Sequence, residues 1–137
     1  MQFLIETDVL RDFLIAKKGE MTILRKALSS GTCYTTMLSA LELFRAAKSK
    51  EETDAVMQML MVVRVLGFNA RYGEIFASSA REIEASTGLV LTDREAMIVG
   101  MAQASKLTIL TKDFFSRYES FRSVPVRQNS EEVPDKK

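Results

Sequence analysis

The sequence predicts an α/β fold with a short, mainly parallel central sheet surrounded by helices. Brief apolar runs alternate along the chain with segments of helical periodicity, which is typical of parallel sheets. The 137 residues are sufficient for one domain with its own hydrophobic core. The apolar fraction of 47% and the charged fraction of 27% are those of an ordinary globular protein.

The first half of the chain opens on a strand and continues mostly in helices. Phe3–Ile5 is a short apolar run that predicts a strand. Behind it, Val9, Leu10, Phe13 and Leu14 recur at helical spacing, and this helix is predicted to end at Lys17-Lys18-Gly19. The next predicted elements are a helix over Met21–Leu28, a strand over Cys33–Thr36, a helix from Leu41 to about Lys50 and a long helix over Glu51–Val65.

The second half repeats the alternation, with Gly88 as the stop signal of its first helix. A single domain is expected over residues 1–128, and the polar residues 129–137 are expected to form a disordered tail. The predicted elements are a strand over Leu66–Asn69, a helix over Ala70–Thr87, a helix over Asp93–Ser105, a strand over Leu107–Leu110, a short helix near Phe114–Tyr118 and a strand near Val124–Val126.

The segment Ala55–Leu66, with the sequence AVMQMLMVVRVL, is apolar on nearly every side. A membrane-spanning helix needs roughly 20 apolar residues, so this segment is too short and no membrane contact is expected. It either belongs to the core or places Met57, Met59 and Met61 in an interface with a second copy or a partner. Both alternatives are open on the sequence alone.

The composition excludes several kinds of chemistry. The chain has no histidine, which excludes Ser-His-Asp and Cys-His catalysis and imidazole metal sites. The single Cys33 excludes an internal disulfide and fits a reducing compartment, and the N-terminus has no signal-peptide pattern, so we expect a cytoplasmic protein. A net charge of +1 leaves nucleic-acid contacts to local clusters of basic residues. Any metal site would have oxygen ligands, which favours Mg²⁺ or Mn²⁺.

Four acidic residues stand where a strand ends or a helix begins. Glu6 follows the first strand, Glu42 the second, Glu95 a polar turn, and Asp113 the Leu107–Leu110 strand. In open parallel sheets such junctions gather at one edge. Two carboxylates about 4 Å apart repel by roughly 4 kcal/mol at an effective dielectric near 20, so converging acids need a cation. A divalent ion there binds a phosphate oxygen and activates water, which indicates metal-assisted phosphodiester hydrolysis.

Local structure offers a second explanation for each acid. Ser39-x-x-Glu42 and Thr92-x-x-Glu95 both have the spacing of a capping box, in which the glutamate reaches back to the helix N-terminus. Asp8 is a candidate N-cap, and Asp113 a candidate turn residue. Each acid taken singly is weak evidence, so the order and spacing of all four carry the hypothesis of a shared site.

The four segments resemble, in order and over residues 2 to about 126, the motifs of the PIN-domain family, close to its VapC-type toxins. In the family, the first motif opens Asp-Thr-Asn-Val-Leu, the second carries a glutamate, and the third and fourth carry acids. The matching segments here are Glu6-Thr7-Asp8-Val9-Leu10, Thr35–Phe44 with Glu42, Gly88–Ala102 with Glu95, and Leu107–Asp113 followed by Phe115. The resemblance implies a PIN-like three-layer α/β/α fold.

Two acids depart from the family pattern. Glu6 and Glu95 stand where the family usually has aspartate, and the extra methylene projects the carboxylate differently and costs more side-chain entropy to fix. Asp8 is placed to restore the charge in the first motif, and Asp93 is placed to do the same in the third. The sequence leaves open whether this site is adapted to its glutamates or has decayed while the fold remained.

The resemblance implies a metal-dependent ribonuclease, the toxin of a type II toxin–antitoxin pair, with RNA, a cognate antitoxin and a second copy of itself as partners. The roles implied are metal ligation by Glu6, Asp8, Glu42, Asp93, Glu95 and Asp113, orientation of the water or a ligand by Thr7 and Thr111, and RNA contacts by Lys112, Arg11, Arg45 and Lys48. The alternatives are a degenerate PIN-like module that binds protein or RNA without cleaving it, and a small phosphatase with acids at its strand ends.

Overall fold

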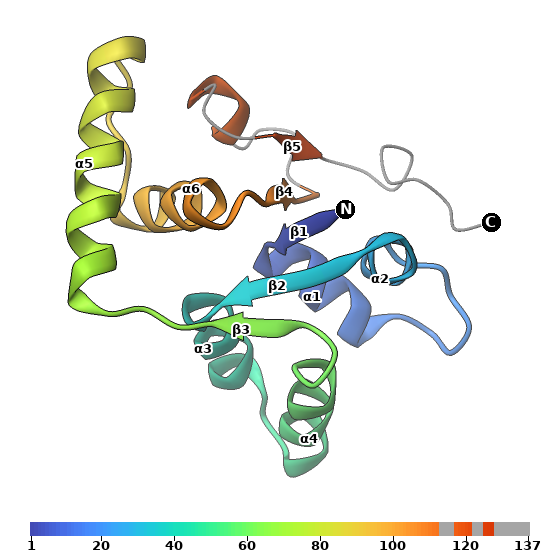
Figure 1. Ribbon diagram of the computed structural model, residues 1–137. Coiled ribbons are helices and arrows are strands. Elements are labelled where there is room, and N and C mark those ends of the chain that lie inside the picture. The colour runs from blue at the N-terminus through green and yellow to red at the C-terminus, as the bar shows by residue number, and fades with distance from the viewer. Residues whose placement is uncertain (113–116, 122–124, 128–137) are drawn as a thin grey trace.

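The computed structural model describes residues 1–112, 117–121 and 125–127, and Figure 1 shows its arrangement. The strands in this part of the chain are β1 (Gln2–Ile5), β2 (Thr32–Thr36), β3 (Arg64–Leu66), β4 (Thr108–Leu110) and β5 (Val126–Arg127). The helices there are α1 (Thr7–Ile15), α2 (Ile23–Ser30), α3 (Met37–Ala46), α4 (Lys50–Met59), α5 (Ala70–Thr87), α6 (Asp93–Ser105) and the short 3₁₀ helix η1 (Tyr118–Phe121).

The five described strands form one sheet in the order β3-β2-β1-β4-β5, and every pair of neighbours is parallel. The central strand β1 pairs through Phe3 with Cys33 of β2 on one side and with Thr108 of β4 on the other. The parallel α/β sheet predicted from the sequence is therefore confirmed.

Helices cover both faces of the sheet. Along β1, Phe3 and Ile5 point into a core with α1, α2, α3 and α4, whereas Leu4 points into a second core with α5, α6 and η1. This alternation follows from the period of two residues in a strand. In Figure 1, α5 lies on the outside of the molecule, with α6 between it and the strands. The three-layer arrangement implied by the resemblance is confirmed.

The carboxyl ends of the three central strands lie side by side, because β2, β1 and β4 are parallel neighbours. At this edge β1 leads through Glu6 into α1, and β2 leads through Thr36 into α3. The hydroxyl of Thr35 also donates a hydrogen bond to the carbonyl of Ile5 over 2.8 Å, which ties the ends of β1 and β2 together. The edge is therefore rigid where the acids emerge.

The predicted bounds are right for α5 and α6 at both ends and differ from the structure in other elements. The helix predicted over Glu51–Val65 ends at Met59, and the strand placed over Leu66–Asn69 is β3, three residues long and centred on Val65. Three of the four residues at 62–65 are β-branched valines, which favour extended backbone and explain the early end of the helix. Helix α3 starts at Met37, earlier than predicted, because Thr36 caps it by accepting a hydrogen bond from the Ser39 amide.

The sequence left open whether the apolar segment 55–66 belongs to the core or to an interface, and the structure divides it between a buried and an exposed part. Val56, Met59 and Val63 are buried in the core. Met57 and Met61 are exposed, with 56% and 82% of their surface accessible. The segment is thus partly core and partly an exposed apolar face. None of the described helices is long and apolar enough to cross a membrane.

Candidate functional site

A pocket of about 410 Å³ opens at the carboxyl edge of the sheet. It collects side chains from the junction of β1 with α1, from α1 and α3, from the start of α6 and from the segments that follow β4. The residues that line it are Glu6, Thr7, Asp8, Arg11, Glu42, Thr92, Arg94, Glu95, Thr111, Arg117 and Tyr118. Among these are three of the four acids predicted to converge, together with Asp8; the fourth, Asp113, lies outside the described residues.

Glu6 presents its carboxylate to this pocket from the end of β1. Its side chain is only 10% exposed, and both oxygens have a hydrogen-bond donor. Oε1 accepts from Arg94 over 2.9 Å, and Oε2 accepts from the hydroxyl of Tyr118 over 2.5 Å. Burial raises the pKa of Glu6, although Tyr118 and Arg94 each lower it.

Glu42 reaches the same place from α3. Ser39 and Glu42 are three residues apart, so they lie on one face of the helix, and both meet Thr7. The Thr7 hydroxyl donates to Glu42 Oε1 over 2.9 Å and is hydrogen-bonded to the Ser39 hydroxyl over 2.8 Å. Thr36, rather than Ser39, caps α3, so the capping-box explanation of Glu42 is wrong and its carboxylate serves the pocket.

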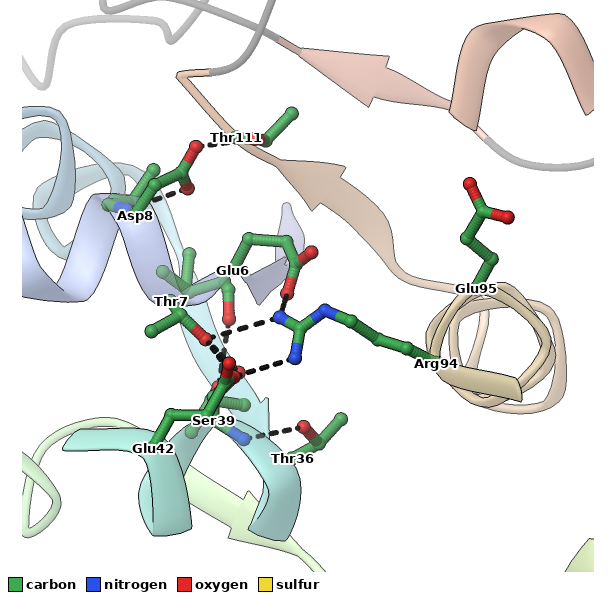
Figure 2. A network of polar contacts seen from close by, with 12 residues as sticks. Glu6, Thr7, Asp8, Thr36, Ser39, Glu42, Arg94, Glu95 and Thr111 are labelled. Carbon is green, nitrogen blue, oxygen red and sulfur yellow. Dashed lines mark hydrogen bonds and ion pairs between the residues drawn. The ribbon is translucent and has the colours of Figure 1, made fainter. Parts of the chain in front are cut away.

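Arg94 connects the two glutamates. It projects from the first turn of α6, and Figure 2 shows its guanidinium between Glu6 on one side and Thr7 and Glu42 on the other. Nη2 donates to Glu6 over 2.9 Å and to Thr7 over 3.3 Å, and Nη1 donates to Glu42 over 2.6 Å. Burial lowers the pKa of Arg94, but the two carboxylates raise it by more, so the guanidinium stays charged.

Asp8 fastens the start of α1 to the end of β4. Its Oδ1 accepts from the Val9 amide over 2.8 Å, and its Oδ2 accepts from the Thr111 hydroxyl over 2.8 Å and from the Lys112 amide over 3.0 Å. Both oxygens of this carboxylate are therefore engaged. Asp8 lines the pocket together with Glu6, and its two hydrogen bonds to Thr111 and Lys112 hold the segment that follows β4.

Glu95 is held at the helix terminus. Its backbone amide donates to the Thr92 hydroxyl over 3.1 Å, and its Oε1 accepts from the Thr92 amide over 2.9 Å, which completes a capping box. Oε2 lies 3.5 Å from Nε of Arg117. Figure 2 shows this carboxylate pointing away from the Arg94 guanidinium. The capping explanation of Glu95 is confirmed, although the residue still lines the pocket.

The remaining predicted residues are spread around the pocket. Arg11 lines it, whereas Arg45 and Lys48 are exposed and are not part of its lining. Lys112 is exposed, and its ammonium group pairs with Asp12 over 2.8 Å. Asp93 is exposed at the start of α6 and is likewise outside the lining.

The donor set fits a hard cation in kind. Every candidate ligand is an oxygen, and a positive group, the Arg94 guanidinium, already sits between Glu6 and Glu42 as a stand-in for an ion. In this arrangement, however, no three acidic or sulfur-bearing side chains of the described residues are close enough to share one ion. The acids are gathered into one pocket, and Arg94 pairs with two of them.

Sequence reasoning missed Arg94, Ser39 and Tyr118, which hold the two glutamates in place. The one signal available for Arg94 was its position, since a basic residue stands inside Thr92–Glu95, the motif expected to deliver an acid. Tyr118 lies 112 residues from Glu6, and no local pattern connects them.

Comparison with known proteins supports the fold. No protein-family model matches the sequence, and no similar curated protein is found. VapBC2 from Rickettsia felis, solved bound to a DNA fragment from their promoter, aligns over 93% of this chain and 98% of its own with a TM-score of 0.71 and 15% identity. VapBC-1 from nontypeable Haemophilus influenzae aligns over the same shares, 93% and 98%, with a TM-score of 0.70 and 14% identity.

A toxin–antitoxin complex from Klebsiella pneumoniae aligns over 84% of this chain and 89% of its own, with a TM-score of 0.62 and 15% identity. These likenesses cover between 84% and 93% of this chain. The chain therefore has the PIN-domain fold of VapC-type proteins, the fold that its four motifs predict.

Proposed function

We propose that this chain is a Mg²⁺- or Mn²⁺-dependent ribonuclease that hydrolyses RNA phosphodiester bonds, and the toxin of a toxin–antitoxin pair. The observation that carries the proposal is the convergence of Glu6, Asp8, Glu42 and Glu95 on one pocket at the carboxyl edge of a parallel sheet. Parallel α/β sheets bind their ligands at this edge, and clustered carboxylates favour a hard cation.

Glu6 and Glu42 are the proposed principal ligands, with Asp8, Asp93, Glu95 and Asp113 as further ligands, directly or through water. A divalent ion bound there supplies a water of lowered pKa and a positive charge for the phosphate oxygens. Thr7 fixes the direction of the Glu42 carboxylate, and Tyr118 does the same for Glu6. We assign to Thr111 the same orienting role, because its hydroxyl holds Asp8.

Basic side chains around the pocket are proposed to meet the RNA backbone. Arg11 and Arg117 lie in its lining, and Lys112 follows the lining residue Thr111 and pairs with Asp12. Arg45 and Lys48, on and just after α3, are proposed to extend this contact away from the pocket. Such contacts position a nucleic acid without reading its sequence.

The test is the substitution Glu42→Gln. The amide keeps the size of the side chain and accepts the Thr7 hydrogen bond, but it removes the negative charge. Mn²⁺-dependent cleavage of single-stranded RNA should fall by about a hundredfold or more. Substituting even a residue that only hydrogen-bonds to a metal ligand lowers activity by up to about a hundredfold. Stability should fall by no more than about 1 kcal/mol, because the ion pair of Glu42 with Arg94 is partly exposed.

The matched control is Glu82→Gln on α5, the same change at an exposed glutamate outside this pocket. Its cleavage rate should equal that of the unaltered protein. Full activity of the Glu42→Gln variant would remove Glu42 from the catalytic site. Cleavage of phosphomonoesters with single-stranded RNA left intact would indicate a phosphatase instead.

A second candidate function is a binding module without nuclease activity. The observation that favours it is the Arg94 bridge, which satisfies Glu6 and Glu42 without a metal ion. In that case millimolar Mn²⁺ would leave the melting temperature unchanged, whereas an ion that binds only the folded state raises it. The two candidates thus differ in a measurement that needs no substrate.

We also propose a cognate antitoxin and a homodimer, with the exposed apolar side chains Met57, Met61 and Val62 in one of these two interfaces. They expose 56%, 82% and 56% of their surface, respectively, and large exposed apolar groups next to one another favour a protein contact. Light scattering tests the dimer. A mass of one chain at all concentrations, for the isolated protein, would contradict it.

A further inference from the structure

Arg94 occupies the position where the proposed function requires an ion. Its guanidinium takes up Oε1 of Glu6 and Oε1 of Glu42 at 2.9 and 2.6 Å. These two carboxylates come from β1 and α3, and the arginine is 88 and 52 residues away from them in sequence. The contact is therefore made by the folded pocket and has no origin in local helix structure.

We propose that Arg94 is a displaceable internal cation, which closes the acidic pocket until a divalent ion takes its place. The inference rests on the proposed function for the location of the ion between Glu6 and Glu42. The inference goes beyond that function because it makes the pocket self-inhibited. Binding of the metal ion and release of Arg94 from the two glutamates then occur together.

The two cations exclude each other. A divalent ion on Glu6 and Glu42 needs the carboxylate oxygens that now accept hydrogen bonds from Nη1 and Nη2. It also adds two positive charges where the guanidinium already supplies one, and like charges at contact distance repel. Since an arginine side chain cannot lose its proton in a protein, it must move for the ion to enter.

The surroundings of Arg94 permit that movement. Its side chain is 34% exposed, whereas that of Glu6 is 10% exposed, so the arginine is the member of the pair that faces water. It is carried on a flexible stem, and its ion pair with Glu42, in which both side chains are partly exposed, contributes little to stability. The arginine is thus the part of the network that leaves most readily.

The carboxylates stay in place when Arg94 moves, because neutral groups hold them. Tyr118 donates to Glu6 Oε2, and Thr7 donates to Glu42 Oε1. Ser39 in turn is hydrogen-bonded to Thr7, and both residues are buried. The site is therefore already shaped for a cation, with one charged group as its removable occupant.

The test compares Mn²⁺ binding to the whole protein and to an Arg94→Gln variant, measured by electron paramagnetic resonance of free Mn²⁺. The variant should bind Mn²⁺ more tightly, on the order of tenfold, because two charge-assisted hydrogen bonds no longer have to be broken first. The matched control is Arg117→Gln, which removes one positive charge from the same pocket without touching Glu6 or Glu42. Its gain in Mn²⁺ affinity should be clearly smaller, because Arg117 pairs with Glu95 over 3.5 Å while Arg94 still bridges Glu6 and Glu42 in this variant.

Equal Mn²⁺ affinity in the Arg94→Gln variant and the unaltered protein would overturn the proposal, and so would equal gains in both variants. If the Arg94→Gln variant does not fold, the unaltered protein still decides the matter. Its Arg94 side-chain NMR signals, assigned with Arg94→Lys, should change over the Mg²⁺ range that raises the melting temperature. A rise in melting temperature with those signals unchanged would contradict displacement.

These outcomes are separable from those of the proposed function. Tighter Mn²⁺ binding by the Arg94→Gln variant without cleavage of RNA supports the internal cation and rejects the nuclease. Metal-dependent cleavage of RNA, with Mn²⁺ affinity unaffected by the variant, supports the nuclease and rejects the internal cation.

Discussion

Glu6 carries its carboxylate in a place that water scarcely reaches. Burial penalises the charged form and raises its pKa above the ordinary 4.5, while Tyr118 and Arg94 limit that rise. The same burial that makes the residue costly also makes it useful, because a cation is attracted more strongly where the dielectric is low. Glu6, whose charge is destabilised by burial, is thus the residue that a bound cation stabilises most.

The raised pKa of Glu6 predicts a pH dependence of stability. Because the folded state holds this proton more tightly than the unfolded chain, its contribution is present in full below pH 4.5 and is lost as the pH rises through the raised pKa. In Glu6→Gln this loss cannot occur. Urea unfolding from pH 4.5 to about pH 7 should show the stability of the variant rising relative to that of the unaltered protein. Parallel stability curves would contradict the assignment.

The packing of α5 on α6 depends on a glycine. A Cβ built on Gly100 of α6 would lie 2.7 Å from Cγ of Phe76 on α5, closer than two carbons can approach. This contact lets the outer helix lie close to the helix that presents Arg94. Phe76 also stacks on Tyr72 and meets the edge of Phe68, so the aromatic group has neighbours that restrict its retreat.

Gly100→Ala should therefore destabilise the protein by about 1–3 kcal/mol, despite the better helix propensity of alanine. Gly73→Ala on α5 is the matched control, because a Cβ there meets nothing within 4 Å. It should stabilise the protein by about 0.5–1 kcal/mol through helix propensity alone. Chemical denaturation measures both. A Gly100→Ala variant as stable as Gly73→Ala would mean that the helices move apart at little cost.

The helices α5 and α6 were predictable from the sequence because their signals are local. Asn69 and Thr92 cap their starts, and Gly88 ends α5 with a positive φ of 75°. The strand β3 was predicted too far along the chain, since an apolar run without periodicity does not tell helix from strand. The parallel sheet itself follows from the alternation of strands and helices. The convergence of the acids at one edge of that sheet was therefore also predictable from the sequence.

The chemistry of the site was only partly predictable. Glu6 enters the pocket from the end of β1 and Glu42 from α3, and Glu95 forms the capping box that its spacing indicates. The pairing of Arg94 with two glutamates depends on the distance between three elements, which a pattern of single residues does not contain. A basic residue inside an acidic motif is the signal to look for in related sequences.

At the scale of the whole molecule, the fold brings together what the chain keeps apart. Three neighbouring parallel strands end at one edge, α3 and α6 begin there, and the pocket lies between them. The same architecture recurs in VapBC2 and VapBC-1 at 15% and 14% identity, so it depends on hydrophobic pattern and topology more than on particular residues. In this chain the pocket at that edge also holds the positive charge of Arg94.

The most direct test of that charge is diffraction at the manganese absorption edge from crystals grown with Mn²⁺. An anomalous peak should appear between the carboxylates of Glu6 and Glu42, with the Arg94 side chain turned out of the pocket. An Arg94 that still bridges both glutamates at saturating Mn²⁺, with no anomalous peak in the pocket, would contradict the account.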